Sequence, residues 1–509
     1  MKLFTMSSIL LAALLLPGAA WTAPRTAAPS QAAVERTVPP QLTGQAPDQI
    51  LPEIVERRLD NGVPVYIAVR PKLPIEEIYF VFPEAVCKND PPGKYGLAET
   101  TLGMMTEGAG NRDILAFNKA VDMLGSRIGA LRGFDTFAIT VSCLTERLPE
   151  TVDLAADAIM LPAFPQRELE RRQKQFPDNY SFMRTSPRFL PGLAFRRLLY
   201  GEEARYGTFK GGTPQQIAAI TRQDLVDYHA EYFTPDKMFI CCCGSADPDA
   251  VTEILNKRVG RWAPGRGMEK HDGSASLRPV SYPKSEPRYI PAGLPENAPM
   301  NGRLFIVDRP GASQSNIRMG SLGITMKDPD RLAVFAMNNV LGGAFSSRLN
   351  ENLRERSGFT YGAGSDFNAW ADHGYFCAYA DVQNDKTVAA VREMFKEIDS
   401  MHQTVPDEEL QRILNYMAYK FPSKFATNDD MTDYMSDRVV YGYPRDYAET
   451  YVSKVLKLTP ADIKRAADRT LDTGRMIVVI VGDAKALEPQ LKEAGWRAQV
   501  LTVDDIMEP

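Results

Sequence analysis

The stretch from Leu341 to Ala363 reads LGGAFSSRLNENLRERSGFTYGA, and it is the segment from which the rest of the chain is most easily placed. Apolar residues at helical spacing lead into it from about Arg331. We expect this helix to end near Arg356, because Gly358 can adopt the left-handed conformation common just after a helix C-terminus. The residues after Gly358 alternate like the start of a strand.

This arrangement places Arg354 in the last helical turn and Tyr361 at the start of the following strand. A guanidinium and a phenol are good hydrogen-bond donors to a carbonyl oxygen or an oxyanion, so the pair is a candidate substrate site. The structural alternative is that Arg354 caps the helix C-terminus and that Tyr361 packs half-buried. The chemistry of the two residues leaves both interpretations open.

The segment resembles the C-terminal homology domain of the M16 (pitrilysin-like) metallopeptidases. The family pattern combines LGG, SSRL, LRE, and a Gly followed by a hydrophobe, any residue and Tyr. The resemblance implies that Arg354 and Tyr361 hold the substrate. The matching positions here are Leu341-Gly342-Gly343, Ser346-Ser347-Arg348-Leu349, Leu353-Arg354-Glu355 and Gly358-Phe359-Thr360-Tyr361.

Further candidate substrate-binding residues lie around this segment. Gly342 and Gly343 permit either close helix packing or close approach of a substrate backbone, and these two readings stay open. The family's Pro-Gly-small-x-Gln motif matches the stretch 310–314, PGASQ, ahead of a strand that in the family lies near the bound peptide. The resemblance therefore implies that Gln314 and Ser315 contact the substrate.

Length, charge and the N-terminus bound the class of protein. A chain of 509 residues predicts more than one domain, and a net charge of -5 gives no reason to expect nucleic acid as a partner. Lys2 and the short apolar run Ile9–Leu16 are typical of a cleaved signal peptide over residues 1–23. We therefore expect a periplasmic or secreted protein with no membrane span after cleavage, and a flexible lead segment over residues 24–50.

The order of predicted strands and helices occurs twice, which indicates an internal duplication. We expect an α+β fold of two homologous domains, each an antiparallel-rich sheet with packed helices. The first domain is expected at 51–262 and the second at 301–495, with a linker over 263–300 that lets the two face each other like a clamp. A tail follows at 496–509. The resemblance implies the two-domain M16B subfamily and its LuxS/MPP-like fold. Matching positions are Pro165–Leu169 with Pro406–Leu410 (offset 241), and Thr221, Asp224 and Gly244 with Thr459, Asp462 and Gly482 (offset 238).

The zinc motif of the family is degenerate in this chain. M16 peptidases carry HxxEH in the first domain, with two His ligands and a Glu as general base, and a further Glu on a downstream helix. The aligned residues here are Glu99, Leu102 and Gly103, and the downstream Glu falls near Pro177, within the stretch 170–180. Leu and Gly offer no donor atom. We therefore expect no metal and no cofactor in this chain.

The remaining chemistry-bearing residues give no other site. The four histidines are not spaced to share a helix face, and no nucleophile elbow or phosphate-binding loop is present. The six cysteines occur mostly in apolar runs, so we expect buried free thiols, although a disulfide is possible.

The resemblance implies a division of labour between two subunits. We expect this chain to be the non-zinc subunit of a heterodimeric peptidase, inactive alone, in which Arg354 and Tyr361 bind a peptide or unfolded polypeptide. The partner would be an M16B homologue that carries HxxEH and holds the zinc. The alternatives are a catalytically inert peptide-binding or assembly protein, and a stand-alone enzyme of unrelated chemistry.

Overall fold

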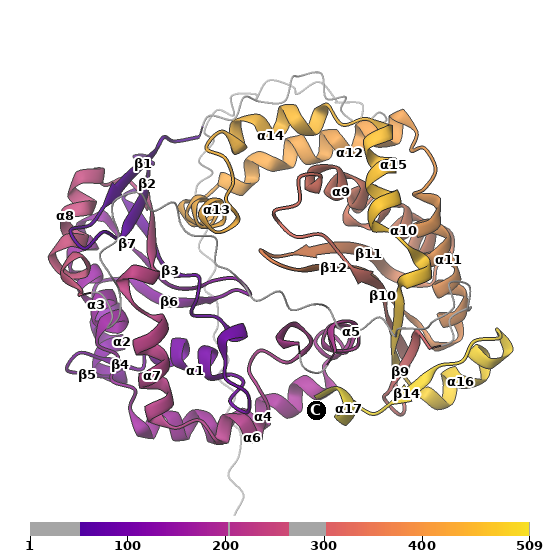
Figure 1. The fold of residues 1–509 in the computed structure, drawn as a ribbon, viewed down its shortest axis with the longest axis horizontal. Helices are drawn as coiled ribbons and strands as arrows, with labels where there is room; N and C mark the ends of the chain where they lie inside the picture. Colours follow the sequence, from indigo (N-terminus) through magenta and orange to yellow (C-terminus); the bar gives the residue numbers. More distant parts are fainter. Residues whose placement is uncertain (1–50, 202–203, 264–301, 508–509) are drawn as a thin grey trace, which may run out of the picture. The chain divides into compact units, whose positions relative to one another are not determined.

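The computed structural model describes residues 51–201, 204–263 and 302–507. The expected signal peptide (1–23), lead segment (24–50) and nearly all of the linker (263–300) lie outside these residues. The described part contains two six-stranded sheets, one in each half of the chain (Figure 1).

The first sheet has the strand order β1-β2-β8-β3-β7-β6. Its neighbouring strands pair antiparallel except for β2 and β8, which pair parallel. The β1–β2 connection is a hairpin at Asn61-Gly62, a dipeptide typical of such turns, and Gly62 supplies the positive φ of 90° that the turn requires. The strands are β1 (Ile54–Arg58), β2 (Pro64–Val69), β3 (Ile75–Phe82), β6 (Arg127–Arg132), β7 (Phe137–Leu144) and β8 (Phe239–Gly244).

The second sheet has the order β11-β12-β10-β13-β9-β14. Pairs from β11 to β13 are antiparallel, whereas β13, β9 and β14 run parallel to one another. The strands are β9 (Leu304–Asp308), β10 (Gln314–Leu322), β11 (Thr360–Ala369), β12 (Gly374–Gln383), β13 (Ile477–Gly482) and β14 (Gln499–Leu501).

The two sheets share one plan, which confirms the predicted duplication. Read from the opposite edge, the second order is β14-β9-β13-β10-β12-β11, so β2, β8, β3, β7 and β6 correspond to β9, β13, β10, β12 and β11. The two halves differ at one edge, where β1 runs antiparallel to β2 and β14 runs parallel to β9. Strand β14 and helix α17 (Val503–Met507) occupy residues that the sequence suggested as a tail.

Helices cover the sheets, and the first half also has a short β4–β5 ladder (Gly108–Ala109 and Arg112–Asp113). Helices of the first half are α1 (Leu97–Met104), α2 (Ile114–Met123), α3 (Leu148–Met160), α4 (Gln166–Thr185), α5 (Leu190–Tyr200), α6 (Pro214–Ala218), α7 (Arg222–Tyr232) and α8 (Pro248–Arg258). Those of the second half, besides α17, are α9 (Arg331–Asn338), α10 (Arg348–Asn350), α11 (Thr387–Ser400), α12 (Asp407–Lys420), α13 (Asn428–Tyr441), α14 (Tyr447–Leu456), α15 (Pro460–Thr470) and α16 (Ala484–Glu493).

Each sheet is covered on both faces, one of them by the other half of the chain. Along β8, Ile240 and Cys242 pack with helices of the first half, whereas the alternate residues Cys241 and Cys243 pack with residues of α13. In return, α5 packs on β10 and β13 of the second sheet. Burial of both faces explains why β8 and β13 are continuous apolar runs rather than alternating ones.

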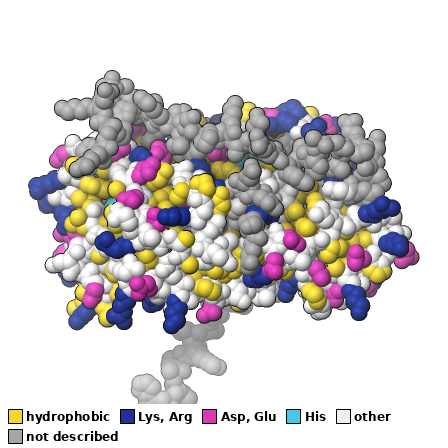
Figure 2. All heavy atoms as spheres, turned by 60° about the horizontal axis from the view of Figure 1, so that its bottom comes forward, with side chains coloured by type: hydrophobic (Ala, Val, Ile, Leu, Met, Phe, Trp, Pro, Cys, Tyr) yellow, Lys and Arg dark blue, Asp and Glu magenta, His cyan; other side chains and the backbone are white. Residues whose placement is uncertain are grey.

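Charges on the surface are mixed. On the face drawn in Figure 2, Lys and Arg side chains are interspersed with Asp and Glu. None of the helices in the described part of the chain combines the length and the apolar character that crossing a bilayer requires.

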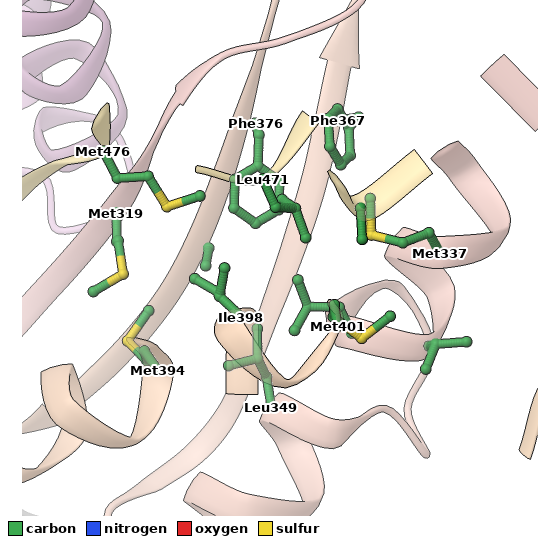
Figure 3. Close-up of a cluster of buried hydrophobic side chains, with 14 of the residues drawn as sticks. Met319, Met337, Leu349, Phe367, Phe376, Met394, Ile398, Met401, Leu471 and Met476 are labelled. Atoms are coloured by element: carbon green, nitrogen blue, oxygen red, sulfur yellow. The ribbon is translucent and has the colours of Figure 1, made fainter. Parts of the chain in front are cut away.

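The core of the second half is rich in methionine. Met319 and Met476 lie on the sheet side of this cluster and Met337, Met394 and Met401 on the helix side, around the ring of Phe376 (Figure 3). Met has an unbranched, flexible side chain that fills irregular gaps between helices and a sheet. This core supports the segment that carries the candidate site.

Candidate functional site

Arg354 lies in a π-helical segment, Glu351–Arg356, that continues α10. Its side chain is 38% exposed, with Nε 3.4 Å from Oε1 of Glu355. The guanidinium carbon also lies 4.9 Å from the ring centroid of Phe345. Within the described residues, the Arg354 side chain donates no hydrogen bond to the last carbonyls of its helix, so the capping alternative has no support in this geometry.

The helix that carries Arg354 is not the continuous one that the sequence suggested. Helix α9 ends at Asn338 and passes into a first π-helical segment, Asn339–Gly343. Residues 344–347 are not helical, and only then do α10 and the second π segment follow. The wider turns are held from outside, because the amide of Asn338 donates to the carbonyl of Ser365 at 2.9 Å on β11. Such π segments are frequent at functional sites.

Gly358 ends the second π segment as expected. It has φ +64°, and its N–H donates to the carbonyl of Arg354 at 3.2 Å. The N–H of Phe359 donates to the carbonyl of Leu353 at 2.8 Å. These bonds close the helix end and direct the chain into β11.

Tyr361 lies in a β-bulge at the start of β11. Thr360 faces Val382 and Ala363 faces Ala380, so β11 has one residue more than β12 between these pairs. The side chain of Tyr361 is 94% exposed, which overturns the alternative that it packs half-buried. The structure therefore brings Arg354 and Tyr361 to the two sides of the Gly358 turn, both open to solvent, although no contact joins them.

The two glycines of the LGG motif differ. Gly342 is buried, and a Cβ there would lie 2.3 Å from the backbone nitrogen of Ser365, so this glycine permits close packing of the π segment on β11. Gly343 is exposed, and the atoms nearest to a Cβ there would be the side-chain amides of Asn338 at 2.9 Å and Asn339 at 3.2 Å and the Asn338 carbonyl at 3.3 Å. Of the two, only Gly343 is placed where a substrate backbone could approach.

Gln314 and Ser315 also differ in exposure. Gln314 is exposed at the start of β10, where it pairs with Gln383. Ser315 is fully buried, and its hydroxyl donates to Oδ1 of Asn384 at 3.0 Å and accepts from Thr387 at 2.9 Å. Strand β10 has neighbours on both sides, so a peptide cannot add to it as a further strand.

Arg348 of the SSRL motif is structural. Its Nε and one terminal nitrogen donate to the two carboxylate oxygens of Glu409 at 2.9 and 2.6 Å. This paired hydrogen bonding raises the pKa of the Arg348 guanidinium and ties α10 to the start of α12.

The degenerate zinc positions lie on α1. Leu102 is fully buried in the core, and Glu99 is half-buried with Oε1 3.9 Å from Sγ of Cys87. Gly103 stands where the family has a histidine ligand. The guanidinium of Arg172 lies beside it and donates to the Gly103 carbonyl at 2.8 Å. A hydrophobe, a glycine and nearby cations do not fit a zinc ion, so the residues of this chain do not form the family's metal site.

The downstream helix α4 carries arginines beside this site. Nε of Arg172 donates to Oε1 of Glu107 at 2.8 Å, and Arg171 donates to the same oxygen at 3.1 Å. A hydrogen bond to Glu168 raises the pKa of Arg171. No sequence motif pointed to Arg171 or Arg172.

The other potential ligands are scattered. In the described part of the chain no three His, Cys, Asp or Glu residues are grouped to hold a metal ion. The ring of His229 interacts with the Ile159 carbonyl at 2.7 Å, and burial lowers its pKa. All six cysteines are buried and free, as expected, and burial raises the pKa of the Cys87 thiol. A buried thiol with a raised pKa is a poor nucleophile, so these cysteines do not provide one.

The comparisons with known sequences point in one direction. A family model described as "Peptidase M16 inactive domain" matches residues 219–417. An uncharacterized zinc protease of Rickettsia bellii is 20% identical over 398 residues, covering 76% of this chain and 88% of that protein. The mitochondrial-processing peptidase subunit alpha of Pongo abelii is 23% identical over 362 residues, covering 69% of this chain and 67% of the relative.

Solved structures share the fold. A peptidase M16 inactive domain from Pseudomonas fluorescens matches with a TM-score of 0.72 at 21% identity, covering 84% of this chain and 98% of that one. A protease from Helicobacter pylori matches with a TM-score of 0.73 at 19% identity, covering 85% of this chain and 100% of that one. The two-domain α+β fold expected from the sequence is thereby confirmed.

Proposed function

Because the chain belongs to the M16 peptidase family, we propose that it is the non-zinc subunit of a two-subunit metalloendopeptidase. Its partner would be an M16B homologue with an intact HxxEH motif, which supplies the zinc and the metal's activation of water. This chain would supply Arg354 and Tyr361 and would be inactive alone. In support, one of its relatives is by its name a subunit of a processing peptidase.

The exposure of Arg354 and Tyr361 carries the proposal. The Arg354 side chain is 38% exposed and Tyr361 is 94% exposed, they flank one turn, and neither donates a side-chain hydrogen bond within the described residues. Both can therefore donate a hydrogen bond to the carbonyl of a substrate peptide that is bound in the partner's active site. Donors placed where negative charge develops stabilise the tetrahedral state more than the ground state.

The sheet edge next to Tyr361 offers a place for the substrate backbone. Strand β11 is an outer strand of its sheet, so one side of its backbone has no paired strand in the described part of the chain. A peptide or unfolded polypeptide can add to such an edge as an extra strand. Gly343 and Gln314 are exposed and remain candidate substrate contacts, whereas Gly342 and Ser315 would act through packing.

We place this reaction in the periplasm, or outside the cell, on the strength of the signal-like sequence at residues 1–23. In that compartment the complex would not encounter nucleic acid as a regular partner, and it would meet unfolded or fragmentary polypeptides. Fractionation of cells that express the full chain tests it.

Substitution of the two donors in the assembled complex tests the role directly. We expect Arg354→Ala to lower turnover by about 10²–10³, the usual effect of removing one oxyanion donor, and Tyr361→Phe to lower it in the same direction. The zinc content and the assembly of the complex should not change. Arg356→Ala is the matched control, because Arg356 is an exposed arginine two residues away that pairs with Glu397 at 3.5 Å.

The results separate the proposed catalytic role from the catalytically inert alternative. Loss of turnover in Arg354→Ala but not in Arg356→Ala supports a shared active site. Unchanged turnover in both Arg354→Ala and Tyr361→Phe, in a complex that assembles normally, would mean that the chain binds peptide or organises the complex without taking part in catalysis.

A further inference from the structure

Two arginines, Arg132 and Arg172, converge on Gly103, where the family places its second zinc-binding histidine, and a third, Arg171, lies beside Glu107. Arg132 ends β6, the outer strand of the first sheet, whereas Arg171 and Arg172 lie on α4. Arg132 and Arg172 meet at Gly103, near the end of α1, and Arg171 and Arg172 meet at Glu107, just after it. A cluster of guanidiniums therefore stands where the sequence has lost its metal ligands.

The charges in this cluster are unequally matched. Glu107 is 7% exposed, and its Oε1 accepts from both Arg171 and Arg172, while Arg171 also pairs with Glu168 at 2.6 Å. Within the described residues Arg132 has no ion pair and no side-chain hydrogen bond. Glu99, one turn before Gly103, forms no ion pair with Arg132 or Arg172 either. One guanidinium is thus left without a counter-charge.

Glycine at position 103 lets two of these guanidiniums approach each other. A Cβ at this position would lie 3.1 Å from a terminal nitrogen of Arg132 and 3.1 and 3.3 Å from the terminal nitrogens of Arg172. Any side chain would thus occupy the space onto which both guanidiniums converge. Two like charges directed at one point repel each other unless an anion lies between them.

We propose that this cluster binds a peptide carboxylate between Arg132 and Arg172. Nε and one terminal nitrogen of Arg172 already donate to Glu107 and to the Gly103 carbonyl, so its other terminal nitrogen is the one directed at the site. A carboxylate has two oxygens and can accept from this nitrogen and from the unpaired guanidinium of Arg132 at once. The inference deepens the function proposed above, because it names a feature of the substrate: a free C-terminal carboxylate or an acidic side chain. It concerns binding by this chain alone, without the partner.

The location of Arg132 favours a peptide as the source of the carboxylate. Strand β6 is an outer strand, so its backbone can pair with an extended peptide that passes Arg132 at the strand end. A carboxylate on that peptide would reach the two guanidiniums while its backbone is held. Exclusion of zinc and recruitment of an anion then follow from the same substitutions in α1.

Direct binding to the isolated full chain tests the proposal. Fluorescence anisotropy would compare three labelled peptides. The first has a free C-terminal carboxylate, the second is the same peptide with a C-terminal amide, and the third is the amide form with one internal residue replaced by Glu. A charge-assisted pair contributes enough that we expect at least one carboxylate form to bind about tenfold or more tighter than the amide form. Comparison of the two acidic forms identifies which carboxylate the site takes.

Three variants make the test specific. Arg132→Gln should remove the preference for the carboxylate, whereas Arg127→Gln, at the other exposed end of β6, should retain it. Gly103→Asp should also remove it, because the new carboxylate would lie between the two guanidiniums and occupy the site from within. Thermal unfolding of each variant shows whether it is folded, and the Gly103→Asp variant should not lose stability, since a helical Gly is replaced and the unpaired charge of Arg132 gains a counter-charge.

The proposal is overturned if the three peptides bind equally, if none binds, or if Arg127→Gln weakens binding as much as Arg132→Gln, since that would mean general attraction to positive charge. None of these outcomes depends on Arg354 or Tyr361. Loss of turnover in the Arg354→Ala complex together with equal binding of the three peptides would reject the carboxylate site and retain the shared active site.

Discussion

The guanidinium of Arg354 lies over the aromatic ring of Phe345, with Cζ 4.9 Å from the ring centroid, although the Phe345 side chain is itself 74% exposed. A phenylalanine this exposed is not held in place by packing in the core. Its ring gives the arginine a preferred position through a cation–π contact, in a segment where no hydrogen bond holds that side chain. Phe345 is therefore a positioning residue for the donor that the proposed reaction uses.

Replacement of Phe345 should weaken catalysis by way of Arg354. A cation–π contact at an exposed site contributes about 0.5–1 kcal/mol, so Phe345→Ala should lower turnover of the assembled complex by about two- to fivefold. In an Arg354→Ala background the same change should have no further effect. Phe182→Ala is the control, because Phe182 on α4 is equally exposed at 74%. Equal losses with and without Arg354 would contradict this positioning role.

The two glycines of the LGG motif should separate stability from function. A Cβ on Gly342 would come within 2.3 Å of the Ser365 backbone, so Gly342→Ala should lower the free energy of unfolding by at least about 1–3 kcal/mol. Gly343→Ala should change stability less, because its Cβ would meet the Asn338 amide at 2.9 Å but no backbone atom closer than 3.3 Å. Urea denaturation measures both. Equal losses in the two variants would show that the packing of the π segment on β11 has been misjudged.

Much of this fold could be predicted from the sequence because repeated local patterns report it. The offsets between the halves, the Asn61-Gly62 hairpin and the glycine after Arg356 each act over a few residues, where turn chemistry and periodicity decide the structure. The π segments could not be predicted in this way. They depend on hydrogen bonds between Asn338 and Ser365, residues that only the folded chain brings together.

The candidate sites divide along the same line. Arg354 and Tyr361 were found because they belong to one long motif. The burial of Ser315 was missed, since its partner Asn384 lies 69 positions further along the chain. The convergence of Arg132 and Arg172 at Gly103 was missed for the same reason. Arg132 lies on β6, Arg172 on α4 and Gly103 near the end of α1, and these residues share no sequence pattern.

Asp437 on α13 predicts a pH dependence of stability. Burial, with a further contribution from Asp433, raises its pKa to about 7, while Lys424 acts in the opposite direction. Between the pKa of an unfolded aspartate, about 3.9, and this value, the native state holds a proton that the unfolded state has released. The stabilisation is therefore complete below about pH 4 and is lost as the pH rises to 7.

Asparagine at position 437 removes this titration. Thermal unfolding from pH 4 to pH 8 should show a flatter stability profile for Asp437→Asn than for the unaltered chain, and a higher melting temperature at pH 8. Burial also raises the pKa of Asp433, so part of the slope should remain. Asp122→Asn, an exposed change on α2, is the control and should leave the profile as it was. Parallel profiles for the Asp437→Asn variant and the unaltered chain would contradict the burial of this carboxyl.

The division of one active site between two chains is the central claim, and a mixing experiment tests it most directly. Cleavage of a quenched fluorescent peptide library would be followed with this chain alone, with an HxxEH-bearing homologue alone, and with the two together. We predict turnover only in the mixture, because this chain lacks the metal ligands and, in the proposed complex, the partner depends on Arg354 and Tyr361 of this chain. Turnover by the homologue alone, unchanged when this chain is added, would contradict the claim.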